Sequence, residues 1–155
     1  MDYFLIGGAP SSGKSEAITR LVDYLIQQKN FVRGNLSSLS QKDFFCTLDG
    51  KDKNNNSIKI LVTSATDTFQ IIDRFALYAK NNNPYKFVIS SIRDEGDSMR
   101  HYFFRKMNVT SNDYCFEMPL AKITRRTTWA VAHQWYKDKI DFILNDFIGR
   151  APFNI

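Results

Sequence analysis

The sequence is poor in the residues that build disulfide frameworks and metal centres. Its 155 residues include two cysteines and two histidines, and they form no Cys-x-x-Cys motif or Cys/His cluster, which argues against a zinc site or a redox motif. Cys46 and Cys115 lie far apart in apolar runs. We therefore expect both thiols to be reduced and buried rather than joined in a disulfide.

Long apolar runs, internal repeats and low-complexity tracts are also missing. No segment approaches the roughly 18 to 20 consecutive apolar residues that span a bilayer, and the N-terminus lacks the basic-then-apolar pattern of a signal peptide. We therefore expect a cytoplasmic protein with no membrane partner. The length predicts a single domain over residues 1–155. Aromatic residues make up 14% of the chain, with 13 phenylalanines, which predicts a core filled by rings.

Basic residues outnumber acidic ones but form no long run. The formal net charge of +5 suits a phosphate-rich partner, which would be either a small phosphorylated ligand or a nucleic acid. Because the positive charges are spread along the chain, nucleic acid is the less favoured partner, although charge alone leaves it open.

A more specific pattern lies near the start of the chain. Residues 8–15 read Gly-Ala-Pro-Ser-Ser-Gly-Lys-Ser and fit the phosphate-binding pattern G-x-x-x-x-G-K-[ST]. An apolar run over residues 3–6 precedes the motif and an amphipathic segment follows it, so the strand-turn-helix context of the motif is present. A Gly/Ser/Pro-rich turn that contained Lys and Ser by coincidence would not need these flanks. The predicted nucleotide-binding residues are Gly8, Ala9, Pro10, Ser11, Ser12, Gly13, Lys14, Ser15 and Glu16.

The chemistry of the motif follows from its residue types. Gly8 and Gly13 permit backbone conformations that a Cβ would obstruct, so successive N–H groups can turn toward phosphate oxygens. These amides also lie at a helix N-terminus, whose partial positive charge favours an anion. Lys14 would contact the β- and γ-phosphates, and the Ser15 hydroxyl would ligate Mg²⁺ together with several waters. We expect Mg²⁺ and ATP, or GTP in its place, as cofactors.

Over about the first thirty residues, the chain resembles the P-loop NTPases. The alternation of strand and helix patterns predicts a three-layer α/β/α fold, with a mostly parallel sheet of about five strands and a β-hairpin after the first helix. The resemblance implies that this fold is the P-loop NTPase fold.

The remaining patterns predict the individual elements. We expect residues 31–41 to be mainly loop, with at most a short strand. A β-hairpin is expected over 43–63, its second strand lying beside the first strand of the sheet. Thr66 or Asp67 would cap the helix that follows. The other predicted elements are a first helix that follows the motif and ends near 29–30, a second with its apolar stripe over 69–79 and a third with its stripe over 99–107 that ends at 108. Strands are predicted at 86–92 and 114–118, and a last helix at about 127–148.

Acidic residues that could share the site are sought at the carboxyl ends of the strands, where parallel α/β sheets bind ligands. The segments expected at that edge are 64–68, 91–96 and the residues after 118. P-loop enzymes hold Mg²⁺ with help from an acid after an apolar strand. Asp67 is the first acid after the hairpin, and we predict that it either reaches the metal through water or caps a helix. Asp94 and Glu95 are the alternative acids.

Three groups of basic side chains complete the candidates. Arg93 stands at the end of a buried strand, where a cation needs a counter-charge or an anionic ligand. It would bind phosphate or pair with one of Asp94, Glu95 and Asp97. Arg126, with Arg125, precedes the last helix and would act as an arginine finger or remain a solvated surface pair. The basic residues expected on the solvent-facing side of the third helix are Arg100, Arg105 and Lys106.

A second, shorter resemblance concerns residues 88–97. The run Val-Ile-Ser-Ser-Ile-Arg-Asp-Glu-Gly-Asp resembles the I-S-D-x-R-x-x-x-E stretch of phage-type deoxynucleoside monophosphate kinases. On that match Arg93 takes the place of the arginine of the family and Asp97 that of the glutamate. Ser91 stands where the family has Asp. The resemblance implies a kinase that transfers phosphate to a small acceptor.

The hairpin also resembles the switch region of small GTPases, with residues 64–68 at the place of the second switch. No Asn-Lys-x-Asp motif occurs, however, and Asp-x-x-Gly is missing after the third predicted strand, which disfavours a GTPase of the Ras kind. The favoured function is a Mg²⁺-dependent P-loop phosphotransferase or NTP hydrolase. Its predicted catalytic residues are Lys14, Asp67, Arg93 and Arg126, and its predicted metal ligands are Ser15 and Asp67. The alternatives are a nucleotide-dependent regulatory module with slow hydrolysis and, last, a nucleic-acid-stimulated ATPase.

Overall fold

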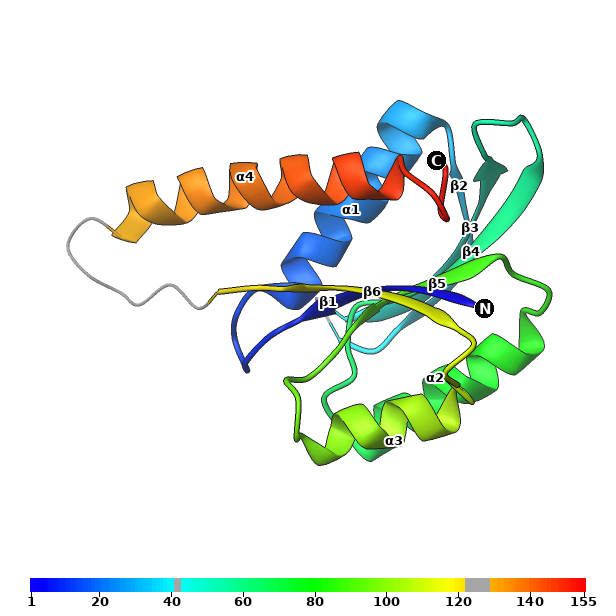
Figure 1. Ribbon diagram of the computed structural model, residues 1–155, viewed down its shortest axis with the longest axis horizontal. Helices are drawn as coiled ribbons and strands as arrows, with labels where there is room; N and C mark the ends of the chain where they lie inside the picture. The colour runs from blue at the N-terminus through cyan, green and yellow to red at the C-terminus, as the bar shows by residue number, and fades with distance from the viewer. Residues whose placement is uncertain (41–42, 122–128) are drawn as a thin grey trace.

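The computed structural model describes residues 1–40, 43–121 and 129–155. Its elements are β1 Asp2–Gly7, α1 Lys14–Lys29, β2 Val32–Ser38, β3 Phe44–Lys51, β4 Ser57–Thr63, α2 Phe69–Asn81, β5 Phe87–Ser91, α3 Ser98–Lys106, β6 Tyr114–Pro119 and α4 Trp129–Ile148. Over the described residues the chain is an α/β protein with a six-stranded sheet in the order β2-β3-β4-β5-β1-β6. Helices α1 and α4 cover one face of the sheet, and α2 and α3 cover the other (Figure 1).

The sheet is parallel around β1 and antiparallel at one end. Strand β1 lies between β5 and β6 and runs parallel to both, and β4 runs parallel to β5. Strands β2 and β3 continue the sheet beyond β4 as antiparallel neighbours. Because helices cover both faces of β1, all its apolar side chains are buried, as expected of a central parallel strand. Its carboxyl end lies between those of β5 and β6.

Two aromatic-rich cores lie on opposite sides of the sheet, which confirms the prediction of a core filled by rings. On the α1/α4 side, Phe4 packs against Phe116 and Phe153, with ring centroids 5.2 and 5.1 Å away. On the α2/α3 side, Phe45 and Phe75 pack with centroids 5.2 Å apart. The alternation of side chains along β1 supplies both cores, since neighbouring residues on a strand face opposite ways.

The sheet differs from the prediction in two respects. It has six strands rather than about five, because residues 32–38 form β2 instead of a loop. This strand lies at the edge of the sheet and is almost wholly exposed. Because it buries little surface, it contains Gly34, Asn35 and serines and lacks the apolar pattern of a buried strand. Strand β4 lies beside β5 and not beside β1 as predicted. The β4–α2–β5 crossover thus joins adjacent strands, which is the usual arrangement for consecutive parallel strands.

Smaller corrections concern helix ends and one thiol. Thr68, rather than Thr66 or Asp67, caps α2, and its side chain accepts a hydrogen bond from the Ile71 N–H. Helix α3 ends at Lys106 rather than 108. Cys46 is buried as predicted but Cys115 is exposed, because its edge strand β6 lacks a neighbour on its outer side.

We expect Phe75→Ala to lower the free energy of unfolding by about 3–5 kcal/mol, because the fully buried ring leaves a cavity between Phe45 and Phe103. The control is Leu77→Ala on the same helix, whose side chain is 61% exposed and whose loss should change stability by less than about 0.5 kcal/mol. Urea unfolding followed by circular dichroism gives both values. Equal effects of the two substitutions would contradict the packing described here.

Candidate functional site

The loop between β1 and α1 has the backbone geometry of an anion cradle. Residues Gly8, Ser11 and Gly13 have positive φ angles of 138°, 60° and 90°, and they turn the chain from the strand into the helix within six residues. Gly13 is the N-cap of α1 and has no side chain to accept the first helical N–H groups. These N–H groups have no intrahelical acceptors, so they are available to an anionic ligand.

Gly8 is required by its surroundings as well as by its φ angle. A Cβ at this position would lie 2.9 Å from the Leu120 carbonyl oxygen and 2.9 Å from Ser12 Oγ, which is closer than real Cβ atoms approach such groups. The Leu120 N–H in turn donates to the Gly7 carbonyl at 2.8 Å. The loop therefore passes directly beside the chain that leaves β6, and its course is fixed on that side.

Lys14 folds back over this loop. Its Nζ donates to the carbonyl oxygens of Gly8 and Ala9 at 2.7 and 2.9 Å, and the residue is only 7% exposed. Burial, and next the nearby Arg93 guanidinium, lower the pKa of Lys14 below its usual value. No described carboxylate pairs with the ammonium group, so the lysine presents a partly desolvated cation whose hydrogen-bond partners among the described residues are two carbonyls.

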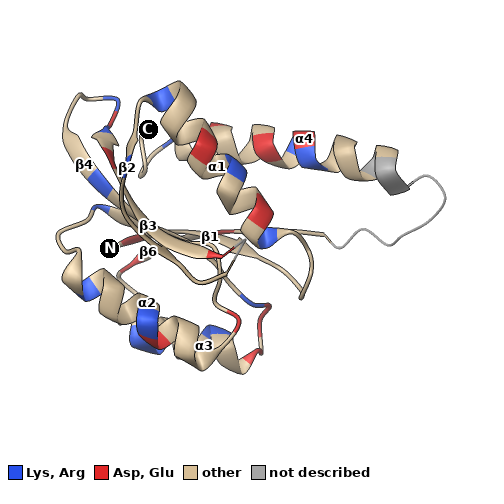
Figure 2. Ribbon diagram, turned by 180° about the vertical axis from the view of Figure 1, so that it is seen from behind, with Lys and Arg blue, Asp and Glu red and all other residues tan. Residues whose placement is uncertain are grey.

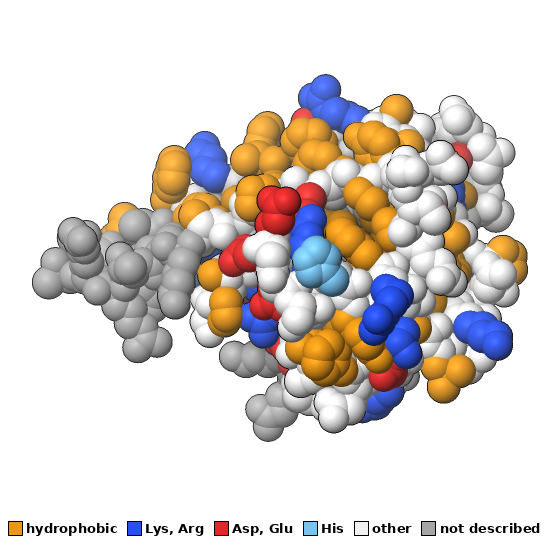
Figure 3. All heavy atoms as spheres, turned by 60° about the horizontal axis from the view of Figure 1, so that its bottom comes forward, with side chains coloured by type: hydrophobic (Ala, Val, Ile, Leu, Met, Phe, Trp, Pro, Cys, Tyr) orange, Lys and Arg blue, Asp and Glu red, His pale blue; other side chains and the backbone are white. Residues whose placement is uncertain are grey.

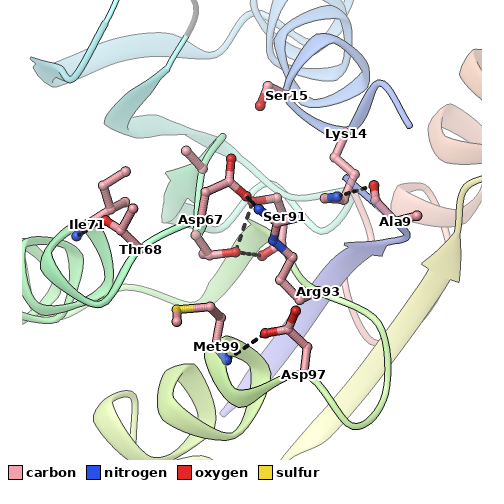
Figure 4. Close-up of polar contacts among 12 residues, drawn as sticks. Ala9, Lys14, Ser15, Asp67, Thr68, Ile71, Ser91, Arg93, Asp97 and Met99 are labelled. Carbon is pink, nitrogen blue, oxygen red and sulfur yellow. Dashed lines mark hydrogen bonds and ion pairs between the residues drawn. The ribbon is translucent and has the colours of Figure 1, made fainter. Parts of the chain in front are cut away.

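A polar cavity of about 460 Å³ opens in front of the loop. Lys14, Ser15, Asp67 and Arg93 surround the same space (Figure 4). The residues that line the cavity are Pro10, Ser11, Ser12, Gly13, Lys14, Ser15, Glu16, Asp43, Ser64, Asp67, Ser91 and Arg93. Most of the predicted nucleotide-binding residues thus line one cavity. Gly8 and Ala9 are not part of its lining, but their carbonyl oxygens accept the hydrogen bonds of Lys14.

Ser15 connects this cavity to the β3–β4 hairpin. Its hydroxyl donates to the Ser64 carbonyl at 2.9 Å. Ser64 is held by the hairpin in turn, since its N–H donates to the Phe44 carbonyl at 3.1 Å and its Oγ accepts from the Phe44 N–H at 2.9 Å. Because the Ser15 hydroxyl donates its hydrogen bond to Ser64, the lone pairs of its oxygen stay available to a cation.

Asp67 and Arg93 were predicted separately, and the structure joins them in one ion pair. Arg93 Nη2 lies 2.7 Å from Asp67 Oδ1, and the arginine side chain is 15% exposed. Arg93 Nε is buried and has no hydrogen-bond partner among the described residues. The alternative partners of Arg93 predicted from the sequence do not pair with it, and Asp97 instead caps α3 through the Met99 N–H at 2.7 Å.

Glu16 is turned partly away from the cavity. Lys137 on α4 donates to its Oε1 at 2.6 Å, and this hydrogen bond lowers the pKa of Glu16. The side chain therefore ties α1 to α4 at the mouth of the site. Arg126, the remaining predicted catalytic residue, lies outside the described residues.

Two features of the site were missed from the sequence. Asp43 lines the cavity because the antiparallel pairing of β3 with β4 returns the start of the hairpin to the carboxyl edge of the sheet. Arg100, predicted to face solvent, instead forms two hydrogen bonds with Glu117 at 2.9 and 2.6 Å and a third with the Arg93 carbonyl at 3.1 Å. This bidentate contact joins α3, β6 and the chain at Arg93, and helical periodicity alone gives no signal for it.

Oxygen donors for a metal are present but sparse. The described residues contain no group of three or more His, Cys, Asp or Glu side chains that could hold a metal ion. Ser15, Asp43 and Asp67 line the cavity with a hydroxyl and two carboxylates. Such a set fits Mg²⁺, which keeps several waters and is usually completed by substrate phosphates, better than a cation that needs an all-protein shell.

Comparisons of the chain with protein-family models, curated protein sequences and solved structures find no match. Within the described residues, no helix is both long and apolar enough to span a bilayer. Along the ribbon, lysine and arginine positions occur in both helix layers and alternate with acidic positions (Figure 2).

We expect Gly8→Ala to destabilise the protein more than Gly96→Ala. Both glycines have positive φ angles, 138° and 85°, so each substitution should cost about 1–2 kcal/mol of backbone strain. Only at Gly8 would the new Cβ also clash, with Leu120 and Ser12, while nothing lies within 4 Å at Gly96. The clash should add roughly 1–3 kcal/mol. Urea unfolding of the two variants measures the difference, and equal losses would show that the loop is not confined at Gly8.

Proposed function

We propose that the chain binds a Mg²⁺–nucleoside triphosphate complex, with ATP as the first candidate, and transfers its γ-phosphoryl group to a small acceptor. The observation that carries the proposal is the position of the Lys14 ammonium group. It is buried against the loop, lacks a described carboxylate partner, and faces the cavity beside the free N–H groups of α1. A polyphosphate would supply the negative charge that this arrangement lacks.

The topology of the sheet supports the same ligand position. From β1 the chain crosses over the α1 face to β2, at the far edge of the sheet, and from β5 it crosses over the α3 face to β6 (Figure 1). The connections from these neighbouring strands therefore diverge at their carboxyl ends. Open α/β sheets bind ligands in the crevice at such a point. Together with the motif at residues 8–15, this arrangement supports assigning the chain to the P-loop NTPase fold.

In this proposal each group of the cavity has one role. The free backbone N–H groups at the start of α1 and the Lys14 ammonium group hold the β- and γ-phosphates, and Arg93 neutralises charge on the transferring group. Ser15, with Asp67 or Asp43 through water, would hold Mg²⁺, which shields phosphate charge when bound. Arg126 stays a sequence-based candidate for closing the site.

The transfer step itself needs little covalent chemistry from the protein. An oxygen of the acceptor forms a bond to the γ-phosphorus, and the bond from this phosphorus to the bridging oxygen breaks. The electron pair leaves with the nucleoside diphosphate, and any proton on the acceptor oxygen passes to solvent. The protein contributes alignment and positive charge, which dominate phosphoryl transfer.

Calorimetry with Mg²⁺–ATP and Mg²⁺–GTP tests the binding site. We expect binding by the wild type and a loss of at least tenfold in affinity in Lys14→Ala, because the variant lacks the charge nearest the phosphates. Lys29→Ala, at the other end of α1, where the lysine donates to the Ile155 carbonyl, should bind as the wild type does. Unimpaired binding in Lys14→Ala would reject the assigned site.

A nucleotide-dependent regulatory module is the second candidate, and the hydrogen bond from Ser15 to Ser64 favours it. A cation or phosphate at Ser15 would act on the hairpin directly through Ser64 and Phe44. The two functions differ in turnover. We expect labelled ATP to transfer phosphate to at least one acceptor in a screen of small phosphates and hydroxyl compounds. Slow hydrolysis without transfer, together with nucleotide-dependent protection of the hairpin from proteolysis, would favour the module instead.

A further inference from the structure

A second hollow lies between the N-terminal end of α2 and one side of α3. It has a volume of about 610 Å³ and is lined by Phe69, Ser98, His101, Tyr102 and Arg105. Hydrophobic and basic side chains lie close together on the face that carries these helices (Figure 3). Its size is within the range of small-molecule sites, which are mainly apolar with a few polar groups that fix orientation.

The apolar wall of this hollow consists of two aromatic rings. Phe69 is 43% exposed, and its ring meets that of Tyr102 edge to face with centroids 4.7 Å apart. The Tyr102 hydroxyl donates to Asp73 at 2.9 Å, which fixes the second ring from behind. An exposed ring held in this way is a preorganised surface for another aromatic ring, because little side-chain freedom remains to be lost on binding.

The rim of the hollow carries a positive charge that no described ion pair neutralises. The Arg105 guanidinium lies 5.0 Å above the Tyr102 ring and forms no ion pair with a described residue. Asp73, which accepts from the Tyr102 hydroxyl, is already paired with Lys106 at 2.6 Å. Asp73, Lys106 and Arg105 together therefore leave one positive charge beside the rings, which favours an anionic ligand.

The hollow adjoins the phosphate cavity through two short segments. Asp67 lines the cavity and Phe69, two residues later, lines the hollow. On the second segment Arg93 lines the cavity and Ser98, five residues later, lines the hollow. In Figure 4 the Asp67–Arg93 pair stands between Lys14 and the two helix starts marked by Thr68 and Asp97. A molecule in the hollow would thus approach the phosphate cavity from the side of Arg93.

We propose that this hollow binds a small aromatic anion, with its ring against Phe69 and its negative group at Arg105. His101 and Ser98 supply hydrogen-bonding groups at the same wall. We assign this molecule as the phosphate acceptor. The acceptor role rests on the proposed function, whereas binding of the aromatic anion does not.

The binding test uses 4-hydroxybenzoate as the probe, because it combines a ring, a carboxylate and an acceptor hydroxyl. Saturation-transfer NMR measures the affinity of the probe. Shifts of the His101 imidazole signals as the probe is added report where it binds. We expect binding to weaken at least tenfold in Phe69→Ala and in Arg105→Gln. Arg74→Gln, an exposed arginine of α2 outside the hollow, serves as the control and should bind as the wild type does.

Two matched probes test the stated chemistry. The alicyclic trans-4-hydroxycyclohexanecarboxylate and the uncharged 4-hydroxybenzamide should each bind at least tenfold more weakly than 4-hydroxybenzoate. Equal binding of the alicyclic acid, or undiminished binding of 4-hydroxybenzoate to Arg105→Gln, would overturn the proposal. Since Phe69 and Arg105 are surface residues, circular dichroism of both variants is expected to match the wild type and to exclude misfolding as the cause.

Lys14→Ala separates this inference from the proposed function. We expect it to lose nucleotide binding and to retain the probe, since the hollow does not include Lys14. Probe binding without any nucleotide binding by the wild type would leave the hollow assigned and reject the proposed function. Nucleotide binding without probe binding would do the reverse. The acceptor role is supported if labelled ATP phosphorylates hydroxylated aromatic acids in preference to their alicyclic counterparts, and it fails if the two are used equally.

Discussion

The candidate site depends on one buried ammonium group. Lys14 is held against its own loop by the Gly8 and Ala9 carbonyls, and these neutral partners compensate only part of the cost of removing a cation from water. The lowered pKa of Lys14 has the same origin. The loop can hold the lysine in this way because it turns sharply at Gly8 and Gly13. The backbone shape of the loop therefore determines where the Lys14 charge is held.

The Asp67–Arg93 ion pair lines the same cavity as Lys14. A phosphate alone would compete with Asp67 for Arg93 and leave the Asp67 carboxylate unpaired beside the cavity. A cation alone would compete with Arg93 for Asp67 and leave the guanidinium unpaired. A Mg²⁺–nucleotide complex supplies both charges, so it could replace the pair as a unit without leaving either side chain unpaired. This balance favours the complex over its separate components as the ligand of the cavity.

The sequence was sufficient to predict the strand, loop and helix around residues 8–15, because the motif specifies local backbone geometry. It did not predict that Asp67 meets Arg93, because that contact depends on strand order. The loops after β4 and β5 are neighbours only because β4 lies beside β5, whereas the apolar pattern of residues 57–63 suits any central position. Strand β2 escaped prediction for a related reason, since an edge strand exposed on both faces carries no apolar periodicity.

The two helix starts beside the ion pair are stabilised independently of it. Thr68 caps α2 through the Ile71 N–H, and Asp97 caps α3 through the Met99 N–H. Arg100 meanwhile holds the Arg93 carbonyl and Glu117, so the backbone at Arg93 is fixed while its guanidinium contacts only Asp67 among the described residues. The Arg93 side chain could therefore change partners without unwinding either helix. A ligand exchange at Arg93 would be local, and it would occur where the segments that line the cavity at residues 8–15 and the hollow at Phe69 are closest along the chain.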